Sequence, residues 1–189
     1  MIRRISNGNP RLFLRIMDAL FYKAQSSKLT PKIQSETLYA FSAKYCSETE
    51  SLEDCGPEIA KKLNAIAEKF KVTTHNDELK ESGTTFRFVD SEFEKQRKWT
   101  EIAIANSRLF VDEISLLNGL TSNSVFELSN VYATYYWLPM RRNSNCPRIS
   151  VSEGDEEKPY SYTITKPKKK EQSELSGQMK LFNEEGNAK

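Results

Sequence analysis

Three proline-led segments in the first 80 residues constrain the fold of this chain more than any other feature. The pairs Asn9-Pro10, Thr30-Pro31 and Gly56-Pro57 each stand directly before a run of amphipathic sequence. Proline fits the first turn of a helix, because the amide hydrogen that it lacks has no partner there, and a preceding Asn or Thr can cap the helix. The apolar residues that follow recur at helical spacing: Leu12, Phe13, Ile16, Met17, Leu20, Phe21 and Ala24, then Leu38, Phe41 and Tyr45, then Ile59, Leu63, Ile66 and Phe70. Residues 1–80 are therefore predicted to form a small bundle of helices.

Residues 84–150 contain short segments that are typical of strands. Thr84–Val89 alternates between apolar and polar residues, as a half-buried strand does. Leu109–Val111 and Val125–Leu128 predict two more strands, with a polar turn at Thr121–Ser124 between them.

Helix signals stand between and after these strands. Ser91 and Glu94 have the spacing of a capping box, which predicts a helix that begins there. Ser129 is expected to cap a last helix over Val131–Trp137, and Pro139 is expected to stop it. Helices combined with short strands in this way are typical of a winged-helix domain. The predicted fold class is mainly α, with a helical bundle followed by a winged-helix domain.

The apolar periodicity disappears after about residue 150. Glu153–Lys158 is rich in charge, Lys166–Lys170 is a basic run, and Glu171–Gly177 is polar. Such a composition buries too little apolar surface to offset the entropy of ordering the chain. Residues 151–189 are therefore predicted to be a disordered tail.

Charge and cysteine content narrow the setting in which the chain works. The 28 Lys and Arg residues nearly balance the 26 Asp and Glu residues, so net charge alone does not imply nucleic acid. No apolar run is long enough to cross a bilayer, and no membrane partner is expected. Cys46, Cys55 and Cys146 are odd in number and lack the spacing of a metal site, which favours reduced thiols and a cytoplasmic location.

The turn that leads into the first predicted helix contains Arg11. One interpretation of Ser6–Leu12 is simply a well-formed helix start. The other is that an arginine in the first helical turn faces an anionic group. The string Gly8-Asn9-Pro10-Arg11 resembles the lid element of initiator-type AAA+ ATPases, relatives of the origin-recognition ATPases that also occur in bacteria. In that family the lid arginine, called the sensor-2 arginine, is directed at the γ-phosphate of ATP.

The resemblance extends in outline over residues 5–145. Thr85–Asp90 resembles the segment that leads into the winged helix of these proteins, and Phe126–Asn130 with Leu138–Arg142 resembles the end of that domain. The resemblance implies an AAA+ lid over residues 1–80 and a winged-helix domain over 84–150.

The chain departs from the family in the nucleotide-binding core. It contains no Gly-x-x-x-x-Gly-Lys-Ser/Thr string to hold phosphates, and no apolar strand that ends in an acidic pair to hold magnesium. We therefore expect a non-catalytic chain without a cofactor of its own. Arg11 would then contact nucleotide only where another chain supplies the P-loop. The chain is expected to be either the C-terminal product of a split or truncated gene, or an independent lid and winged-helix protein.

Double-stranded DNA is the expected nucleic-acid partner, and the residues expected to contact it are basic. Arginine and asparagine suit phosphates and base edges, although a solvated helix face also explains the basic residues of the segment Lys95–Lys98. Tyrosines 132, 135 and 136 with Trp137 are interpreted as core rather than as base-stacking residues, because their spacing is helical. The expected DNA-binding residues are Lys95, Lys98, Arg141, Arg142 and Arg148.

A short apolar motif stands alone in the predicted tail. Gln178, Met179, Leu181 and Phe182 resemble the peptide that binds the bacterial sliding clamp, in which a Leu-Phe pair fills a pocket and a Gln bonds to its rim. A short helix that packs back on the domain is the alternative. Two further functions stay open for the whole chain: a protein-interaction domain that does not bind DNA, and a stand-alone winged-helix regulator.

Overall fold

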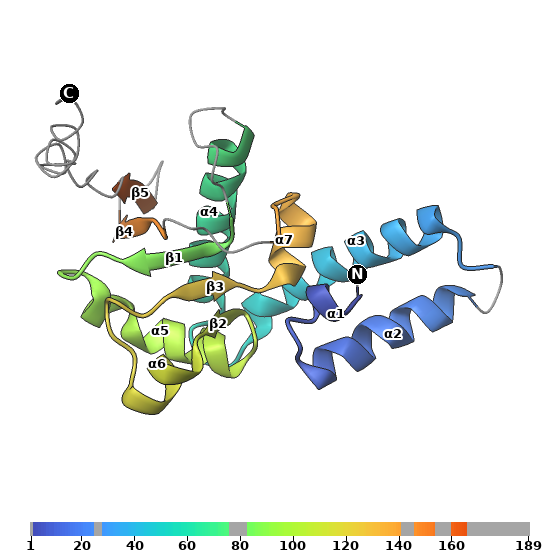
Figure 1. Ribbon diagram of the computed structural model, residues 1–189, viewed down its shortest axis with the longest axis horizontal. Helices are drawn as coiled ribbons and strands as arrows, with labels where there is room; N and C mark the ends of the chain where they lie inside the picture. The colour runs from blue at the N-terminus through green and yellow to red at the C-terminus, as the bar shows by residue number, and fades with distance from the viewer. Residues whose placement is uncertain (1, 25–27, 76–82, 141–145, 154–159, 166–189) are drawn as a thin grey trace, which may run out of the picture.

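The computed structural model describes residues 2–24, 28–75, 83–140, 146–153 and 160–165, and the fold is mostly helical with one small mixed sheet (Figure 1). No helix in these ranges is long and apolar enough to span a membrane. The elements in chain order are α1 (Ile2–Ile5), α2 (Pro10–Ala24), α3 (Pro31–Ser47), η1 (Glu48–Ser51), α4 (Gly56–His75), β1 (Thr85–Phe88), α5 (Phe93–Ala105), β2 (Leu109–Val111), α6 (Glu113–Asn118), β3 (Phe126–Leu128), α7 (Asn130–Tyr136), β4 (Arg148–Glu153) and β5 (Tyr160–Thr165).

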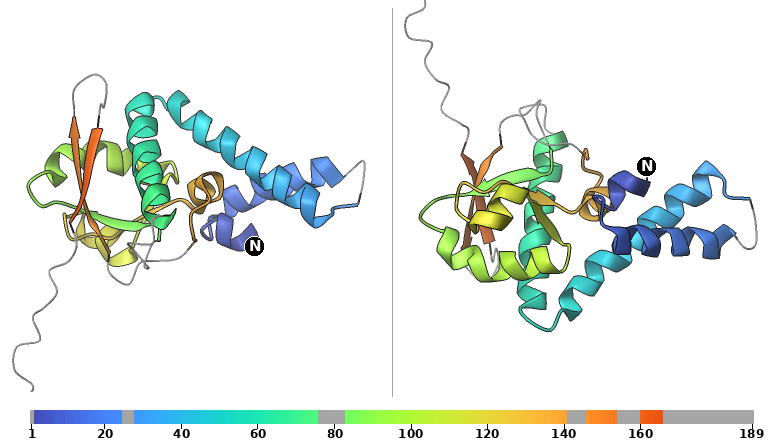
Figure 2. Two further views of the ribbon diagram at one scale, coloured as in Figure 1. Left: turned by 90° about the horizontal axis from the view of Figure 1, so that it is seen from above. Right: turned by 60° about the horizontal axis from the view of Figure 1, so that its bottom comes forward.

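The three proline-led helices are confirmed as α2, α3 and α4. The Asn9 side chain accepts a hydrogen bond from the Leu12 amide at 3.1 Å, and the Thr30 hydroxyl accepts one from the Ile33 amide at 3.3 Å. These caps satisfy amides that the first turn of a helix leaves without partners. α2 and α3 then pack side by side as a hairpin that extends away from the sheet (Figures 1 and 2).

Gly56 lets α4 begin close to η1. A Cβ atom at this buried position would lie 2.7 Å from the backbone oxygen of Glu50, a distance that real Cβ atoms do not show. Glycine is therefore required here by close approach of two backbone segments. The result is that α4 turns back from α3 and runs past the sheet (Figure 2).

The sheet has the strand order β2-β3-β1-β4-β5. β1 pairs antiparallel with β3 and parallel with β4, and β4 pairs antiparallel with β5. The strand pairing corrects the prediction of a disordered tail from residue 151, because residues 151–153 and 160–165 belong to strands. The reason is that β1 lies between β3 and β4, and β4 supplies partners for backbone groups of β1 that β3 does not reach.

Local details in residues 84–150 differ from the sequence predictions. Ser91 and Glu94 do not form a capping box: Glu92 is the residue before α5, and Glu94 pairs with Arg97 at 2.6 Å. The polar turn at Thr121–Ser124 is confirmed, since the Ser124 amide donates to the Thr121 carbonyl at 3.0 Å, but the short helix α6, capped by Asp112, was not predicted. α7 ends before Pro139 is reached, since Trp137 adopts a left-handed conformation with φ 59°.

The part of the winged-helix prediction that the structure supports is the three-stranded unit. A helix (α4), a strand (β1), a helix (α5) and two antiparallel strands (β2 and β3) follow one another in that order. A helix-turn-helix uses two consecutive helices. Within residues 83–140, α5 is the single helix between β1 and β2, so a pair of consecutive helices does not occur at that place.

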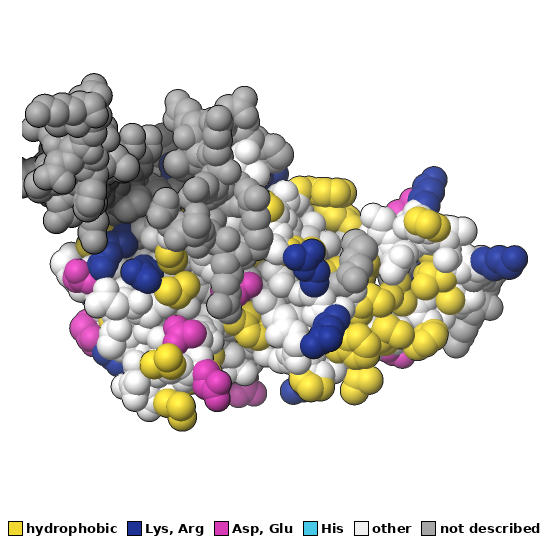
Figure 3. Space-filling view, in the orientation of Figure 1, with side chains coloured by type: hydrophobic (Ala, Val, Ile, Leu, Met, Phe, Trp, Pro, Cys, Tyr) yellow, Lys and Arg dark blue, Asp and Glu magenta, His cyan; other side chains and the backbone are white. Residues whose placement is uncertain are grey.

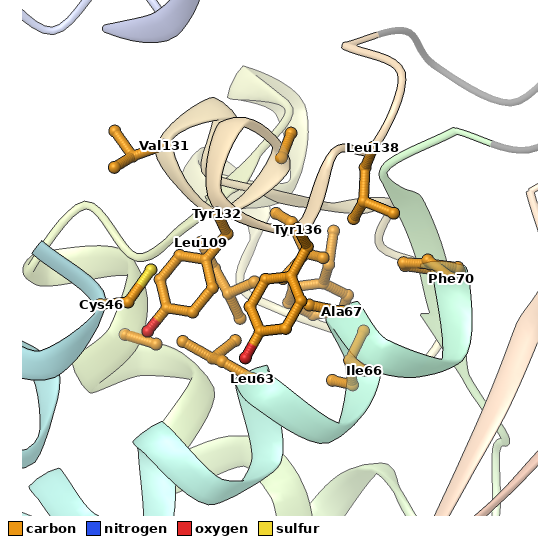
Figure 4. Close-up of a cluster of buried hydrophobic side chains, with 14 of the residues drawn as sticks. Cys46, Leu63, Ile66, Ala67, Phe70, Leu109, Val131, Tyr132, Tyr136 and Leu138 are labelled. Carbon is orange, nitrogen blue, oxygen red and sulfur yellow. The ribbon is translucent and has the colours of Figure 1, made fainter. Parts of the chain in front are cut away.

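One continuous core joins the helical hairpin to the sheet. α7 lies at its centre, because it packs against α1, α3 and α4. Tyr132 and Tyr136 point from α7 toward Leu63 and Cys46 (Figure 4), and Tyr132 is fully buried. These two tyrosines are therefore core residues, as their helical spacing predicts, whereas Trp137 at the end of α7 is 68% exposed.

Burial of Cys46 leads to a prediction about its reactivity. Burial raises the pKa of this thiol from its ordinary value of 9.0 to about 12, against the opposing effect of Arg108. Because the thiolate is the reactive form, we expect Cys46 to resist iodoacetamide at pH 8 until the chain is unfolded. The same shift predicts that stability is unaffected below about pH 9 and falls as pH rises toward 12, because the unfolded thiol ionises first. Mass spectrometry of alkylated native and urea-unfolded protein measures the first effect, and rapid native labelling of Cys46 would contradict it.

Candidate functional site

A pocket of about 240 Å³ lies where the start of α2 meets α3 and the connection between α5 and β2. Segments about 100 residues apart in the sequence form its wall. The lining residues are Asn9, Arg11, Leu12, Arg15, Tyr45, Leu52, Ala105, Asn106, Ser107 and Arg108.

Two hydrogen bonds to Ser107 hold the parts of the pocket together. The Asn9 side-chain amide donates to the Ser107 hydroxyl at 2.7 Å, and the Tyr45 hydroxyl donates to the Ser107 carbonyl oxygen at 2.9 Å. Asn9 therefore has two roles, since its other side-chain atom caps α2. Ser107 itself has a φ of 59°, which turns the chain sharply between α5 and β2. Such a conformation is rare for a residue other than glycine and is commonly held in place by its surroundings.

Arg11 and Arg15 come from α2, one turn apart. Arg11 lies in the first turn of α2, as the sequence predicts. It is exposed, and no ion pair of Arg11 is seen among the described residues. Arg15 differs, because its guanidinium pairs with the Glu48 carboxylate at 2.8 Å. The start of α2 itself has little anion-binding capacity left: Pro10 has no amide hydrogen, and the amides of Leu12 and Phe13 bond to Asn9.

Arg108, like Arg15, is a charged lining residue that the sequence pattern did not identify. Only 5% of its surface is exposed, and its guanidinium carbon lies 3.5 Å from the centre of the Tyr45 ring. Among the described residues, nothing accepts a hydrogen bond from its Nε. Burial raises the pKa of Tyr45 overall, although the adjacent Arg108 cation acts in the opposite direction. No local pattern marks Arg108, because it becomes part of the pocket only through the fold.

The charge of the pocket favours an anion. Three arginines line it, no lining residue is acidic, and Glu48 at its edge is already paired with Arg15. Guanidinium groups form paired hydrogen bonds with phosphate or carboxylate oxygens. The lining contains no Ser-His or Cys-His pair of the kind that activates a nucleophile. Within the described ranges, no cluster of His, Cys, Asp and Glu is suited to a metal ion. The pocket therefore has the charge and the hydrogen-bond donors to bind an anion.

The other predicted site residues lie away from this pocket. Lys95 and Lys98 are exposed on α5. Arg148 on β4 donates to the Asp90 carboxylate at 2.7 Å and to the Asn123 side-chain oxygen at 2.9 Å. The predicted sites at Arg141, Arg142, Gln178, Met179, Leu181 and Phe182 lie outside the described residues.

Comparison with known proteins gives one match. A family model described as ORC-CDC6-like matches residues 1–146, which is most of the chain. No curated protein and no solved structure matches this chain. The match covers both the helical hairpin and the segment up to the start of β4, so it includes every residue of the pocket.

Proposed function

This chain belongs to the ORC-CDC6-like family and is a relative of initiator-type AAA+ ATPases, and from that premise we propose that it is the non-catalytic, DNA-associated part of such an ATPase system. In this proposal the α2–α3 hairpin acts as the lid. Arg11 completes a nucleotide site whose P-loop is supplied by another chain. We infer from this role that the protein works in the cytoplasm, where the DNA of a bacterium and reduced cysteines are found together.

The observation that carries the proposal is the position of Arg11. It stands at the start of α2, in the wall of a pocket whose charged lining residues are all arginines. A developing negative charge on a transferred phosphate is stabilised by such an arginine, supplied by the same chain or by a partner. The sequence lacks the phosphate-binding loop itself. In this proposal Arg11 therefore faces a P-loop that lies outside residues 1–189.

An exposed apolar surface on the α2–α3 hairpin favours contact with a protein partner. Figure 3 shows hydrophobic side chains gathered over this part of the molecule, beside Lys and Arg side chains. Leu14, Phe21 and Tyr22 on α2 are each more than 60% exposed. A contiguous apolar patch on a folded domain commonly marks an interface. The same surface also supports the second candidate function, a protein-interaction domain that does not bind DNA.

For DNA we propose contacts from α5 and from the segment after α7. α5 is the helix between β1 and β2, and Lys95 and Lys98 project from its exposed side. Arg141 and Arg142 follow α7 in the sequence and complete the proposed set. Arg148 is expected to contribute less, because Asp90 and Asn123 already hold its guanidinium.

The DNA proposal predicts weak, salt-sensitive binding to duplex DNA of any sequence. With few phosphate contacts, the slope of log affinity against log salt is expected to be about −2 to −4. Replacing Lys95 and Lys98 by Ala, or Arg141 and Arg142 by Ala, should each reduce the slope by about 2. Gel-shift titrations measure this. The matched control is Lys28→Ala with Lys32→Ala, which removes two exposed charges at the far end of the hairpin. No binding at low salt would favour the protein-interaction function.

For the C-terminal motif we propose binding to a sliding clamp. A peptide of residues 173–189 should bind a bacterial clamp with a dissociation constant near the micromolar range, on the order of −8 kcal/mol. Replacing Leu181 and Phe182 by Ala removes both anchors and should cost about 2–4 kcal/mol. Lys180→Ala is the control, because that position is variable in the motif. Fluorescence anisotropy compares the peptides, and equal signals from wild type and double variant would refute the proposal.

A further inference from the structure

We propose that Arg108 is a second phosphate-binding residue, so that Arg11 and Arg108 together hold the polyphosphate end of a nucleotide in the pocket. The inference rests on the proposed function for the source of the nucleotide. It adds a phosphate-binding residue from outside the α2–α3 hairpin, because Arg108 lies at the junction of α5 and β2.

The environment of Arg108 is unfavourable without an anion. Its guanidinium is almost completely buried, and its Nε has no acceptor among the described residues. A buried polar group that lacks a hydrogen-bond partner destabilises a protein, and a buried charge does so more strongly. Stacking on Tyr45 offsets part of this cost, since the face of an aromatic ring attracts a cation. A phosphate in the pocket that Arg108 lines would supply a negative charge to compensate its guanidinium.

The pocket is built before any ligand arrives. Hydrogen bonds from Asn9 and Tyr45 to Ser107 place Arg108 against the start of α2. The backbone of Arg108 is also held, because its amide donates to the Ala103 carbonyl at 2.8 Å and its carbonyl accepts from the Ser129 amide at 3.1 Å. Such preorganisation reduces the entropy lost on binding. A phosphate bound here would therefore be linked to α5, β2 and the start of α7 as well as to α2.

Arg15 has a different role from Arg11 and Arg108. Its guanidinium lies 5.8 Å from the centre of the Tyr45 ring, on which Arg108 also stacks. Glu48 neutralises it, whereas no carboxylate pairs with Arg11 or Arg108 in the described part of the chain. Two unneutralised arginines in one pocket suit a ligand with two negative groups. Inorganic pyrophosphate has that chemistry and is small enough to serve as the probe.

Calorimetric titration of the full chain with pyrophosphate at low salt tests the inference. We expect one saturable site with a dissociation constant on the order of 0.1–1 mM. Arg11→Gln and Arg108→Lys should each weaken binding at least tenfold, the second because lysine lacks the planar fork of arginine. Lys28→Gln removes one exposed charge elsewhere and should leave the affinity unchanged. Absence of binding to the wild type, or unchanged binding by folded Arg108→Lys, would overturn the inference.

A second measurement keeps the test independent of whether the Arg108 variant folds. In the wild-type protein, the NMR signal of the Arg108 Nε–H group should shift with pyrophosphate and follow the calorimetric curve. A signal that does not move while pyrophosphate binds would exclude Arg108 as a ligand. A short DNA duplex should not displace pyrophosphate, and displacement would mean that the pocket takes backbone phosphate instead. Because all of these experiments use the chain alone, their failure is distinct from a failure of the shared ATPase site.

Discussion

Replacing Arg11 by Ala is expected to lower the ATP hydrolysis of the shared site by about 10³-fold, the lower end of the range for arginines that contact a transferred phosphate. Arg11 is exposed at the start of α2 and lines the cationic pocket. Its removal therefore takes away transition-state stabilisation without disturbing the core. The measurement is the turnover of a P-loop ATPase of the same family with wild-type or variant chain added.

Two comparisons make the Arg11 result specific. The chain without the partner should hydrolyse no ATP, because its sequence contains no phosphate-binding loop. Lys28→Ala, which changes an exposed charge away from the pocket, should leave the turnover of the mixture as it is. If Arg11→Ala supports the same turnover as wild type, the shared-site proposal fails and the protein-interaction function becomes the better account.

Replacing Phe126 by Ala is expected to lower the free energy of unfolding by about 3–5 kcal/mol. Phe126 on β3 is fully buried, and its ring centre lies 5.1 Å from that of Phe88 and 5.8 Å from that of Phe86. Phe86 and Phe88 lie on β1, the central strand of the sheet. The substitution therefore opens a cavity where neighbouring side chains cannot readily collapse. Such a loss is a large part of the stability of a typical domain.

Urea unfolding followed by circular dichroism measures the effect of Phe126→Ala. Leu117→Ala is the matched control: Leu117 is also large and apolar, but it lies on α6 and is 80% exposed. Its substitution should change the free energy of unfolding by no more than about 0.5 kcal/mol. Similar values for both variants would mean that the aromatic cluster around Phe126 is not the part of the core that stabilises this fold.

The helical part of the fold could be predicted from the sequence because its signals are local. Asn9 and Thr30 cap helices through bonds to residues three positions later, and proline marks each start. The exposed position of Arg11 follows from the same signals. Ser129 likewise caps α7 as expected. Interactions within one helical turn depend little on the rest of the chain, so a single sequence is enough to locate them.

Other features depend on partners far away in the sequence. Glu92 accepts hydrogen bonds from the Ser150 hydroxyl and the Val151 amide, and it precedes α5 in place of the predicted cap. Residues 148–153 form a strand because β1 and β5 are there to pair with them, although their own periodicity is weak. A strand depends on its neighbours for every ladder bond, which is why its existence is hard to predict from local pattern.

The candidate site divides in the same way. By itself, the sequence determined that an arginine stands in the first turn of α2 and that three helices precede a mixed segment. Only the tertiary structure decided that Ser107 bonds to Asn9 and Tyr45, and that Arg108 is thereby buried beside α2. The physical reason is range: a cap is completed within one turn of backbone, whereas a pocket between residues 9 and 108 forms only when packing joins them.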